Sequence, residues 1–250
     1  MRILVIGESC LDEYVYGTCE RVCPEAPALC FKSNGKKNTT NGMAANVVRN
    51  ILSIFPSANI DLITNKQKII KRRFIDVRYN SIVFREDVHD SCERINTKKH
   101  KYQNYDAIVF SDYDKGFLRE CDLDFICRNS SVKFMDTKKR PSDLSMINFL
   151  KVNQKEYIDN IQSLKLPDNC HLIVTDGENG ARHTYKQKTK NYQTKKVEVR
   201  DVCGAGDTFL AALVVGYMKT KKVEASIRFA NQCSLKVVHQ FGICVPKGKK

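Results

Sequence analysis

Short apolar segments that each end in a cluster of polar residues recur through the second half of the chain. They cover residues 107–110, 132–135, 149–152 and 171–174. A fifth segment, at residues 3–6, is apolar and rich in β-branched side chains, and Glu8 and Asp12 follow it. Such runs are typical of buried strands in a parallel sheet, where ligands bind beyond the carboxyl ends of the strands. The pattern predicts an α/β fold with a mostly parallel central sheet and a ligand site along one edge.

A glycine-rich stretch at residues 201–208 precedes an apolar run of helical length. Gly204, Ala205 and Gly206 would bring backbone N–H groups together at the start of a helix, where the helix dipole favours an anion. Asp207 is costly in such a pocket unless it has a task, and taking a proton from a hydroxyl that attacks a phosphoryl group fits. A capped glycine turn explains the same residues equally well, and the stretch alone does not decide.

The length and cysteine content bound the class of protein. A chain of 250 residues buries one substantial core, which predicts a single domain over residues 1–250. The apolar start is too short for a signal peptide and no run is long enough to span a membrane, so we expect a cytoplasmic protein without a membrane partner. Without a secretion signal, and with an odd count, the eleven cysteines are expected to be reduced.

The net charge of +14 is compatible with nucleic-acid binding, with small anionic ligands or with a lysine-rich surface. No helix-turn-helix, RNA-recognition or zinc-finger pattern occurs, so a nucleic-acid partner is disfavoured. The basic side chains cluster at residues 66–73, 98–101, 186–196 and 247–250, with few aromatic residues between them. We therefore expect most of these clusters to be solvated surface.

The segments at residues 12–33 and 68–86 are predicted to form a small β lid. Pro24 and Pro27 make the first segment a poor central strand and favour an edge or flap, which would exclude water from a site. Residues 69–76 and 81–85 predict an antiparallel pair. The polar run from 34 to 40 predicts a loop, and helices are expected from 42 to about 55 and from 222 to 240.

Several polar residues in this half of the chain allow two interpretations. Asp12 suits sugar hydroxyls but also suits the cap of a turn. Asn46 offers both a donor and an acceptor, although an asparagine within a helix can equally face solvent. Four arginines of the predicted hairpin could bind a phosphorylated substrate, but solvated strand faces are favoured: Arg72, Arg73, Arg78 and Arg85.

The order of the motifs resembles one known family. Gly204 to Asp207 resembles the signature of the ribokinase-like (PfkB) carbohydrate kinases, and Asn153-x-x-Glu156 resembles their second motif. Further segments are similar to the branch that phosphorylates D-glycero-β-D-manno-heptose 7-phosphate on its anomeric hydroxyl. These segments, in the same order along the chain, are residues 7–12, 16–17, 21–27, 111–116 and 229–231.

The resemblance implies a three-layer α/β/α sandwich with a small β lid, and phosphoryl transfer from ATP to a sugar phosphate. It implies that Asp207 is the general base and that the N–H groups of Gly204, Ala205 and Gly206 stabilise the transferring phosphate. Magnesium would be organised, largely through water, by the side chains of Asn153 and Glu156.

The same resemblance places the ligands. It places ATP along Asn153, Gln154, Lys155, Glu156, Thr175, Asp176, Gly177, Gly180 and Asn231. It places the sugar near Asp12, Gly42 and Asn46, and we expect Lys115 with an arginine of the hairpin to bind the substrate's own phosphate. Pairing of flap strands between subunits predicts a homodimer.

Three departures from the family pattern keep alternatives open. Met43 replaces the second glycine of a G-G-A-A-N motif, and residues 60–64 run almost directly into the next strand without the family's additional helix. The chain stops at Lys250, so we expect no fused nucleotidyltransferase domain. A kinase of the same fold for another sugar or a nucleoside, and a binding protein that has lost catalysis, remain alternatives.

Overall fold

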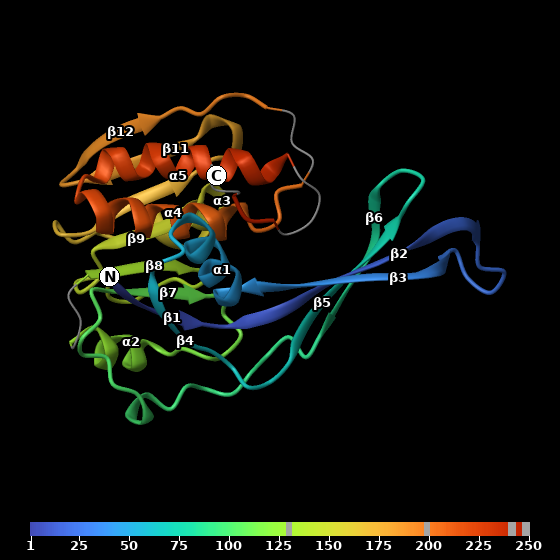
Figure 1. Ribbon diagram of the computed structural model, residues 1–250, viewed down its shortest axis with the longest axis horizontal. Helices are drawn as coiled ribbons and strands as arrows, with labels where there is room; N and C mark the ends of the chain where they lie inside the picture. The colour runs from blue at the N-terminus through green and yellow to red at the C-terminus, as the bar shows by residue number, and fades with distance from the viewer. Residues whose placement is uncertain (129–131, 198–200, 240–243, 247–250) are drawn as a thin grey trace.

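The computed structural model describes residues 1–128, 132–197, 201–239 and 244–246, and an eight-stranded sheet forms its centre (Figure 1). The strand order is β12-β11-β10-β9-β8-β7-β1-β4. Strands β10 to β4 in this order run parallel, whereas β11 and β12 form an antiparallel hairpin at the opposite edge. The bounds are β1 Arg2–Gly7, β4 Asn59–Ile63, β7 Ala107–Asp112, β8 Val132–Thr137, β9 Phe149–Asn153, β10 His171–Thr175, β11 Ala181–Tyr185 and β12 Lys188–Tyr192.

Alternate side chains of β1 pack into two apolar clusters, one on each face of the sheet. Ile3 and Val5 join the cluster formed with α1, α4 and α5, whereas Leu4 and Ile6 join the cluster that includes α2. The alternation follows from the two-residue repeat of a strand and produces the predicted three-layer sandwich. The helices are α1 Ala44–Ile54, α2 Glu120–Cys127, α4 Ala205–Thr220 and α5 Val223–Val238, with short turns at η1 Thr97–Lys99, α3 Gln154–Glu156, η2 Tyr157–Ile161 and η3 Gly177–Asn179.

Helix α4 is the central helix of its layer. It packs against α1 and α5 and against the sheet, and its residues 207–215 are all buried. Because these residues are apolar apart from the first two, the helix needs neighbours on every side. Its amino end therefore lies inside the protein, at the carboxyl edge of the sheet.

A second sheet has the order β3-β2-β5-β6 and extends away from the main body (Figure 1). Strand β2 pairs antiparallel with β3 and parallel with β5, and β5 pairs antiparallel with β6. The antiparallel pair expected from the sequence is therefore present. The bounds are β2 Ser9–Val22, β3 Leu29–Met43, β5 Ile69–Asp76 and β6 Ser81–Val88.

The prediction of a loop over residues 34–40 is wrong. These residues lie within β3, where Lys37 to Asn41 pair with Val15 to Leu11 of β2. Strand β3 is at the edge of the small sheet, and residues 34–39 are exposed. A solvated edge strand needs no apolar residues, so its polar sequence is indistinguishable from that of a loop.

Other features of the chain bear on the sequence expectations. Helix α1 ends two residues before Pro56, as predicted. Helix α5 ends at Val238. The predicted end of this helix, Gln240, lies outside the described residues, as do residues 247–250 of the last basic cluster. The cysteines at positions 10, 19, 23, 30, 92, 121, 127, 170, 203 and 233 are free thiols. Within the described ranges, no helix is both long and apolar enough to cross a membrane.

The packing of α4 predicts a large loss of stability on Leu213→Ala. Leu213 is fully buried in the cluster of α1, α4 and α5, so truncation leaves a cavity that costs about 2–5 kcal/mol in the free energy of unfolding. Leu52→Ala on α1, where Leu52 is 40% exposed, serves as the matched control and should cost less than about 1 kcal/mol. Urea denaturation measures both, and equal losses would contradict the described core.

Candidate active site

The start of α4 requires glycine at two positions. Gly204 has a φ of 77°, in the left-handed region where a side chain adds strain. A Cβ atom on Gly206 would lie 3.0 Å from the Nζ atom of Lys151. The Ala205 N–H donates to the Val202 carbonyl oxygen at 3.2 Å, so one of the three N–H groups expected to bind an anion already has an acceptor. The glycines thus bring the first turn of α4 close to β9.

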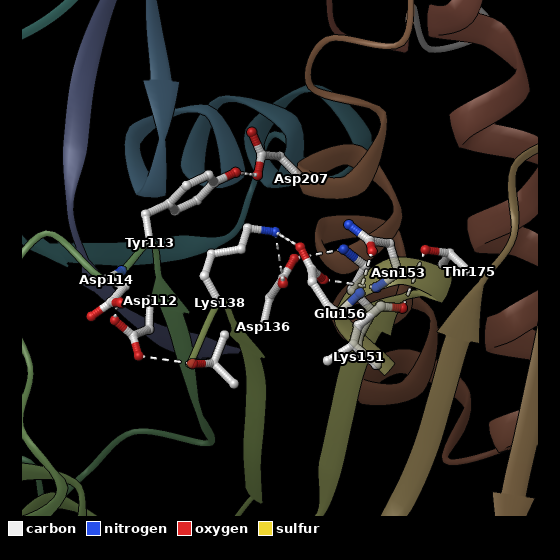
Figure 2. Close-up of polar contacts among 12 residues, drawn as sticks. Asp112, Tyr113, Asp114, Asp136, Lys138, Lys151, Asn153, Glu156, Thr175 and Asp207 are labelled. Carbon is white, nitrogen blue, oxygen red and sulfur yellow. Dashed lines mark hydrogen bonds and ion pairs between the residues drawn. The ribbon is translucent and has the colours of Figure 1, made fainter. Parts of the chain in front are cut away.

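Two hydrogen bonds hold the carboxylate of Asp207, and Figure 2 shows the one from Tyr113. Asn46 Nδ2 donates to Oδ2 at 2.9 Å, and the Tyr113 hydroxyl donates to Oδ1 at 2.6 Å. Burial, and to a smaller extent the charge of Asp136, raise the pKa of Asp207. The two hydrogen bonds and the charge of Lys151 lower it. The net result is a pKa above the ordinary value of an aspartate. A carboxylate with a raised pKa and fixed geometry is well suited to accept a proton near neutral pH.

A chain of buried amide and hydroxyl groups sets the orientation of Asn46. Asn50 Nδ2 donates to the Asn46 backbone oxygen at 2.8 Å and to its Oδ1 at 3.2 Å. The Thr208 hydroxyl in turn donates to Asn50 Oδ1 at 2.8 Å. Because Asn46 Oδ1 accepts from Asn50, the amide nitrogen of Asn46 faces Asp207.

Glu8 fixes the loop that carries Tyr113. Its buried carboxylate accepts the backbone N–H groups of Tyr113, Lys115 and Phe117 at 2.8, 3.0 and 3.2 Å. Its backbone oxygen accepts the N–H of Ala44, the first residue of α1, at 2.9 Å. One residue therefore positions both elements that contact Asp207, because α1 carries Asn46.

A second charged cluster lies at the ends of β8 and β9 (Figure 2). Lys151 Nζ pairs with Asp136 Oδ2 at 2.6 Å, and both side chains are buried. Lys138 Nζ pairs with Glu156 Oε1 and lies 3.8 Å from Asp136 Oδ1. Burial lowers the pKa of Lys138, but the two carboxylates outweigh this and the net pKa is raised. Asn153 and Glu156 bond each other's backbone N–H at 2.8 Å, which fixes Glu156.

The oxygen atoms of this cluster fit a magnesium ion. Asp136 Oδ1 is buried and has no hydrogen-bond partner, and the carboxylate of Glu156 and the amide of Asn153 lie at the adjacent strand end. Among the described residues, no group of three or more His, Cys, Asp or Glu side chains is arranged to hold a metal by itself. The donor set therefore suits an ion that is bound largely by phosphate and water.

A cavity of about 190 Å³ adjoins the start of α4. Its lining includes four residues predicted to bind ATP, Thr175, Gly177, Gly180 and Asn231, together with Ala205 and Gly206. The predicted residues Gln154 and Asp176 line a neighbouring cavity of about 410 Å³, whereas Lys155 is exposed and lines neither cavity. Hydrogen bonds fix part of the wall, since Asn231 Nδ2 donates to the Tyr192 backbone oxygen at 2.9 Å.

Asp12 and Gly42 lie together at the base of the small sheet. Asp12 pairs with Arg73 at 2.5 Å, and both are buried. A Cβ atom on Gly42 would lie 1.9 Å from Asp12 Oδ2, so a side chain at this position of β3 would clash with the carboxylate. Met43 has a φ of 58°, in the left-handed region, and its buried side chain packs with Cys10 and Ile69. The methionine thus combines a strained backbone with apolar packing.

Each hairpin arginine considered for phosphate binding has a carboxylate partner. The pairs are Arg72 with Glu13 and Glu86, Arg73 with Asp12, Arg78 with Asp76 and Arg85 with Asp87. Lys115 pairs with Asp90 at 2.5 Å. Lys71 differs, because no ion pair of this residue is found in the part of the chain that the structure describes. Its Nζ lies 5.2 Å from the centre of the Tyr113 ring. Burial lowers the pKa of this lysine. Lys71 is therefore a further cation at the site.

Structural neighbours define the fold class. Ribokinase from Thermotoga maritima superimposes with a TM-score of 0.73 at 17% identity, covering 96% of this chain and 94% of that one. Phosphofructokinase-2 from Escherichia coli gives a TM-score of 0.76 at 14% identity, covering 98% and 95%. The chain has the ribokinase-like fold that the motifs predict.

Sequence comparison relates the chain to known kinases. Residues 142–249 match the model of the pfkB family of carbohydrate kinases. A relative from Campylobacter concisus, the bifunctional protein HldE, is 31% identical over 97% of this chain and 62% of its own length. HldE of Sulfurimonas denitrificans is 29% identical over 96% and 61%. The chain thus spans about three-fifths of the length of these relatives.

Sequence reasoning missed several residues of the site. Tyr113 and Lys138 lie within the polar clusters that follow two predicted strands, and the sequence does not distinguish them from the other residues of these clusters. Lys151 gave a clearer signal, because it is a charged residue inside an apolar strand segment. Glu8 follows the first strand and lies within a family-like segment, but neither position indicates that it organises the loop of Tyr113. Their roles depend on contacts between distant segments.

Glu8→Gln tests whether this residue organises the site. The amide loses the charge that strengthens three hydrogen bonds and turns a donor toward backbone N–H groups, so the free energy of unfolding should fall by about 2–4 kcal/mol. Glu93→Gln, at an exposed position, is the control and should leave the stability unchanged. Urea denaturation compares the variants, and equal stability of both would contradict the role of Glu8.

Proposed function

We propose that this chain is an ATP-dependent kinase that phosphorylates the anomeric hydroxyl of D-glycero-β-D-manno-heptose 7-phosphate. The observation that carries the proposal is the buried carboxylate of Asp207, held by Asn46 and Tyr113 at the edge of the sheet. Burial of a carboxylate costs folding free energy, and such groups concentrate at catalytic sites. The similarity to pfkB carbohydrate kinases supports phosphoryl transfer to a sugar.

The choice of a heptose phosphate is supported by the ordered motifs along the whole chain and by the similarity to HldE proteins. The residues around Asp12 also favour an anionic acceptor. Lys71 lies beside Tyr113 in the site, and burial lowers the pKa of Lys71 although the charge of Asp12 acts to raise it. A phosphate on the substrate would supply a counter-charge for Lys71.

In the proposed reaction, Asp207 takes the proton of the sugar hydroxyl. At the same time the hydroxyl oxygen bonds to the γ-phosphorus of ATP, and the bond between that phosphorus and ADP breaks. Asn46 keeps the carboxylate oriented, and the glycines at the start of α4 let the phosphoryl group approach the backbone. Lys138 would exchange its contact with Glu156 for a phosphate oxygen. Bound magnesium, held by Asp136, Glu156 and Asn153 with water, would neutralise phosphate charge.

The cavity beside α4 supports the proposed placement of ATP. Its wall combines Gly177 and Gly180 with the face of α5 that carries Asn231, and it opens next to Gly206. A Cβ atom on Gly180 would lie 2.2 Å from the Tyr192 backbone oxygen, so a glycine is needed to form this wall. The base of the nucleotide would occupy this cavity, with its phosphates directed along the start of α4 toward the Lys138 cluster.

A panel of acceptors with ATP and Mg²⁺, followed by ADP release, tests the proposed function. Heptose 7-phosphate should be turned over, and Asp207→Asn should lower kcat about 10²–10⁴-fold because the general base is lost. Asp124→Asn, at an exposed position on α2, is the control and should retain most activity.

Other outcomes would replace the proposal. Turnover of unphosphorylated sugars or nucleosides alone would indicate a kinase with a different acceptor. Saturable binding of ATP or sugar phosphate without ADP release would indicate a binding protein. Undiminished turnover in Asp207→Asn would remove Asp207 as the base.

We further propose a homodimer that forms through the small sheet. This sheet projects from the body (Figure 1). It carries exposed apolar side chains, with Val22, Leu29 and Phe84 each more than half exposed. Burial of such a surface against a second copy would remove it from water.

Light scattering after size-exclusion chromatography tests the dimer. The wild-type protein should have twice the mass of the chain, and Phe84→Asp should yield monomers because a charge would be buried in the interface. Phe125→Asp on α2, where the ring is 44% exposed, is the matched control and should remain dimeric. A monomeric wild-type protein would exclude this interface.

A further inference from the structure

Tyr113 connects three parts of the site that no other described residue joins in the same way. Its hydroxyl donates to Asp207 on α4 (Figure 2), and two lysine ammonium groups lie near its ring. Lys71 comes from strand β5 of the small sheet and Lys138 follows β8, and the Nζ of each lies 5.2 Å from the ring centre. The ring therefore lies between the small sheet and the cluster proposed to meet the phosphates of ATP.

The backbone holds Tyr113 in place independently of any ligand. The N–H of Tyr113 donates to Glu8 at 2.8 Å, and the next turn contains two residues in the left-handed region, Asp114 with a φ of 58° and Gly116 with a φ of 98°. The N–H of Asp114 donates to the Asp112 carboxylate at 3.2 Å. A tight loop with several internal contacts leaves the ring little freedom to move away from Asp207.

We propose that Tyr113 is a positioning residue of this kinase, whose hydroxyl keeps the Asp207 carboxylate oriented and charged while the acceptor hydroxyl binds. The proposal rests on the proposed function, because it assigns Tyr113 a task in the same reaction. A phenol that donates to a carboxylate stabilises the ionised form, and it leaves the second lone pair of that oxygen for the substrate.

The charges around Asp207 explain why one hydrogen bond matters. Burial and the charge of Asp136 on β8 raise its pKa, whereas Lys151 on β9 and the bonds from Asn46 and Tyr113 lower it. Lys138, after β8, and the thiol of Cys10 on β2 also interact with Asp207 electrostatically. Removal of the hydroxyl leaves the opposing influences in place, so the pKa of Asp207 must rise further and less base is ionised at a given pH.

The pH dependence of turnover in Tyr113→Phe tests the proposal, with heptose 7-phosphate, ATP and Mg²⁺ as reactants. The acid limb of the kcat profile should move to higher pH, with kcat lowered about tenfold on that limb and largely recovered at alkaline pH. The KM for either reactant should change less than threefold. Tyr105→Phe is the matched control, because Tyr105 donates to Asp61 at 2.7 Å far from the site, and its profile should match the wild type.

A titration without turnover separates the two proposals. Carbon-13 NMR of labelled aspartate, with Asp207→Asn identifying the resonance, should show a higher pKa of Asp207 in Tyr113→Phe than in the wild type. Incorporation of 3-fluorotyrosine at position 113, a stronger donor, should shift both the titration and the acid limb to lower pH. This variant also covers the case in which Tyr113→Phe fails to fold.

The outcomes are distinguishable. If no acceptor is phosphorylated, or Asp207→Asn stays active, the proposed function fails whatever the titration shows. If Asp207→Asn is inactive but Tyr113→Phe and the fluorinated protein keep the wild-type pH profile and titration, only the role of Tyr113 is overturned. An effect confined to KM would likewise overturn it, because the residue would then serve binding alone.

Discussion

The geometry of the candidate site depends on one buried carboxylate, that of Glu8. It accepts three backbone N–H groups from the loop after β7, and its own backbone oxygen accepts the first N–H of α1. A buried charge of this kind is stable only when hydrogen bonds replace its lost hydration. Glu8 therefore ties together two segments that are far apart in sequence. Tyr113 and Asn46, the two residues that hold Asp207, lie on these segments.

In the proposed reaction, Asp207 accepts a proton and the cluster around Lys138 binds phosphate, and these two tasks need groups of opposite charge. Asp207 is buried with hydrogen-bond donors that offset only part of the cost of its charge, so its pKa is raised. Lys138 lies half-buried between carboxylates, so its pKa is also raised and it stays a cation. The pair of Lys151 with Asp136 stands between these groups and acts on Asp207 with both signs. Proton acceptance and phosphate binding thus occupy adjacent but distinct surroundings.

The small sheet shows how charge in a sequence can mislead. Its arginines suggest a basic surface for phosphate, yet each is paired with a carboxylate of the same sheet. Such pairs on a thin, solvated sheet order its side chains more than they add stability. Arg73 is an exception, because it is buried with Asp12 beside Gly42. Among the described residues of this sheet, Lys71 lies near the site without an ion pair, and the composition gave no reason to choose it among forty-two basic residues.

The sequence by itself determined the fold class, the succession of site-bearing strands along the chain, and the glycine-flanked Asp207, because these follow from local apolar runs, turn residues and motifs. It failed for residues 34–40, since a solvated edge strand has no apolar repeat to reveal it. Only the tertiary structure decided which side chains meet. Tyr113, Lys138 and Glu8 owe their positions to contacts between segments up to about a hundred residues apart, as in the bond from Phe117 to Glu8. No local pattern encodes such contacts, because the sheet brings the strand ends together only after the chain has folded.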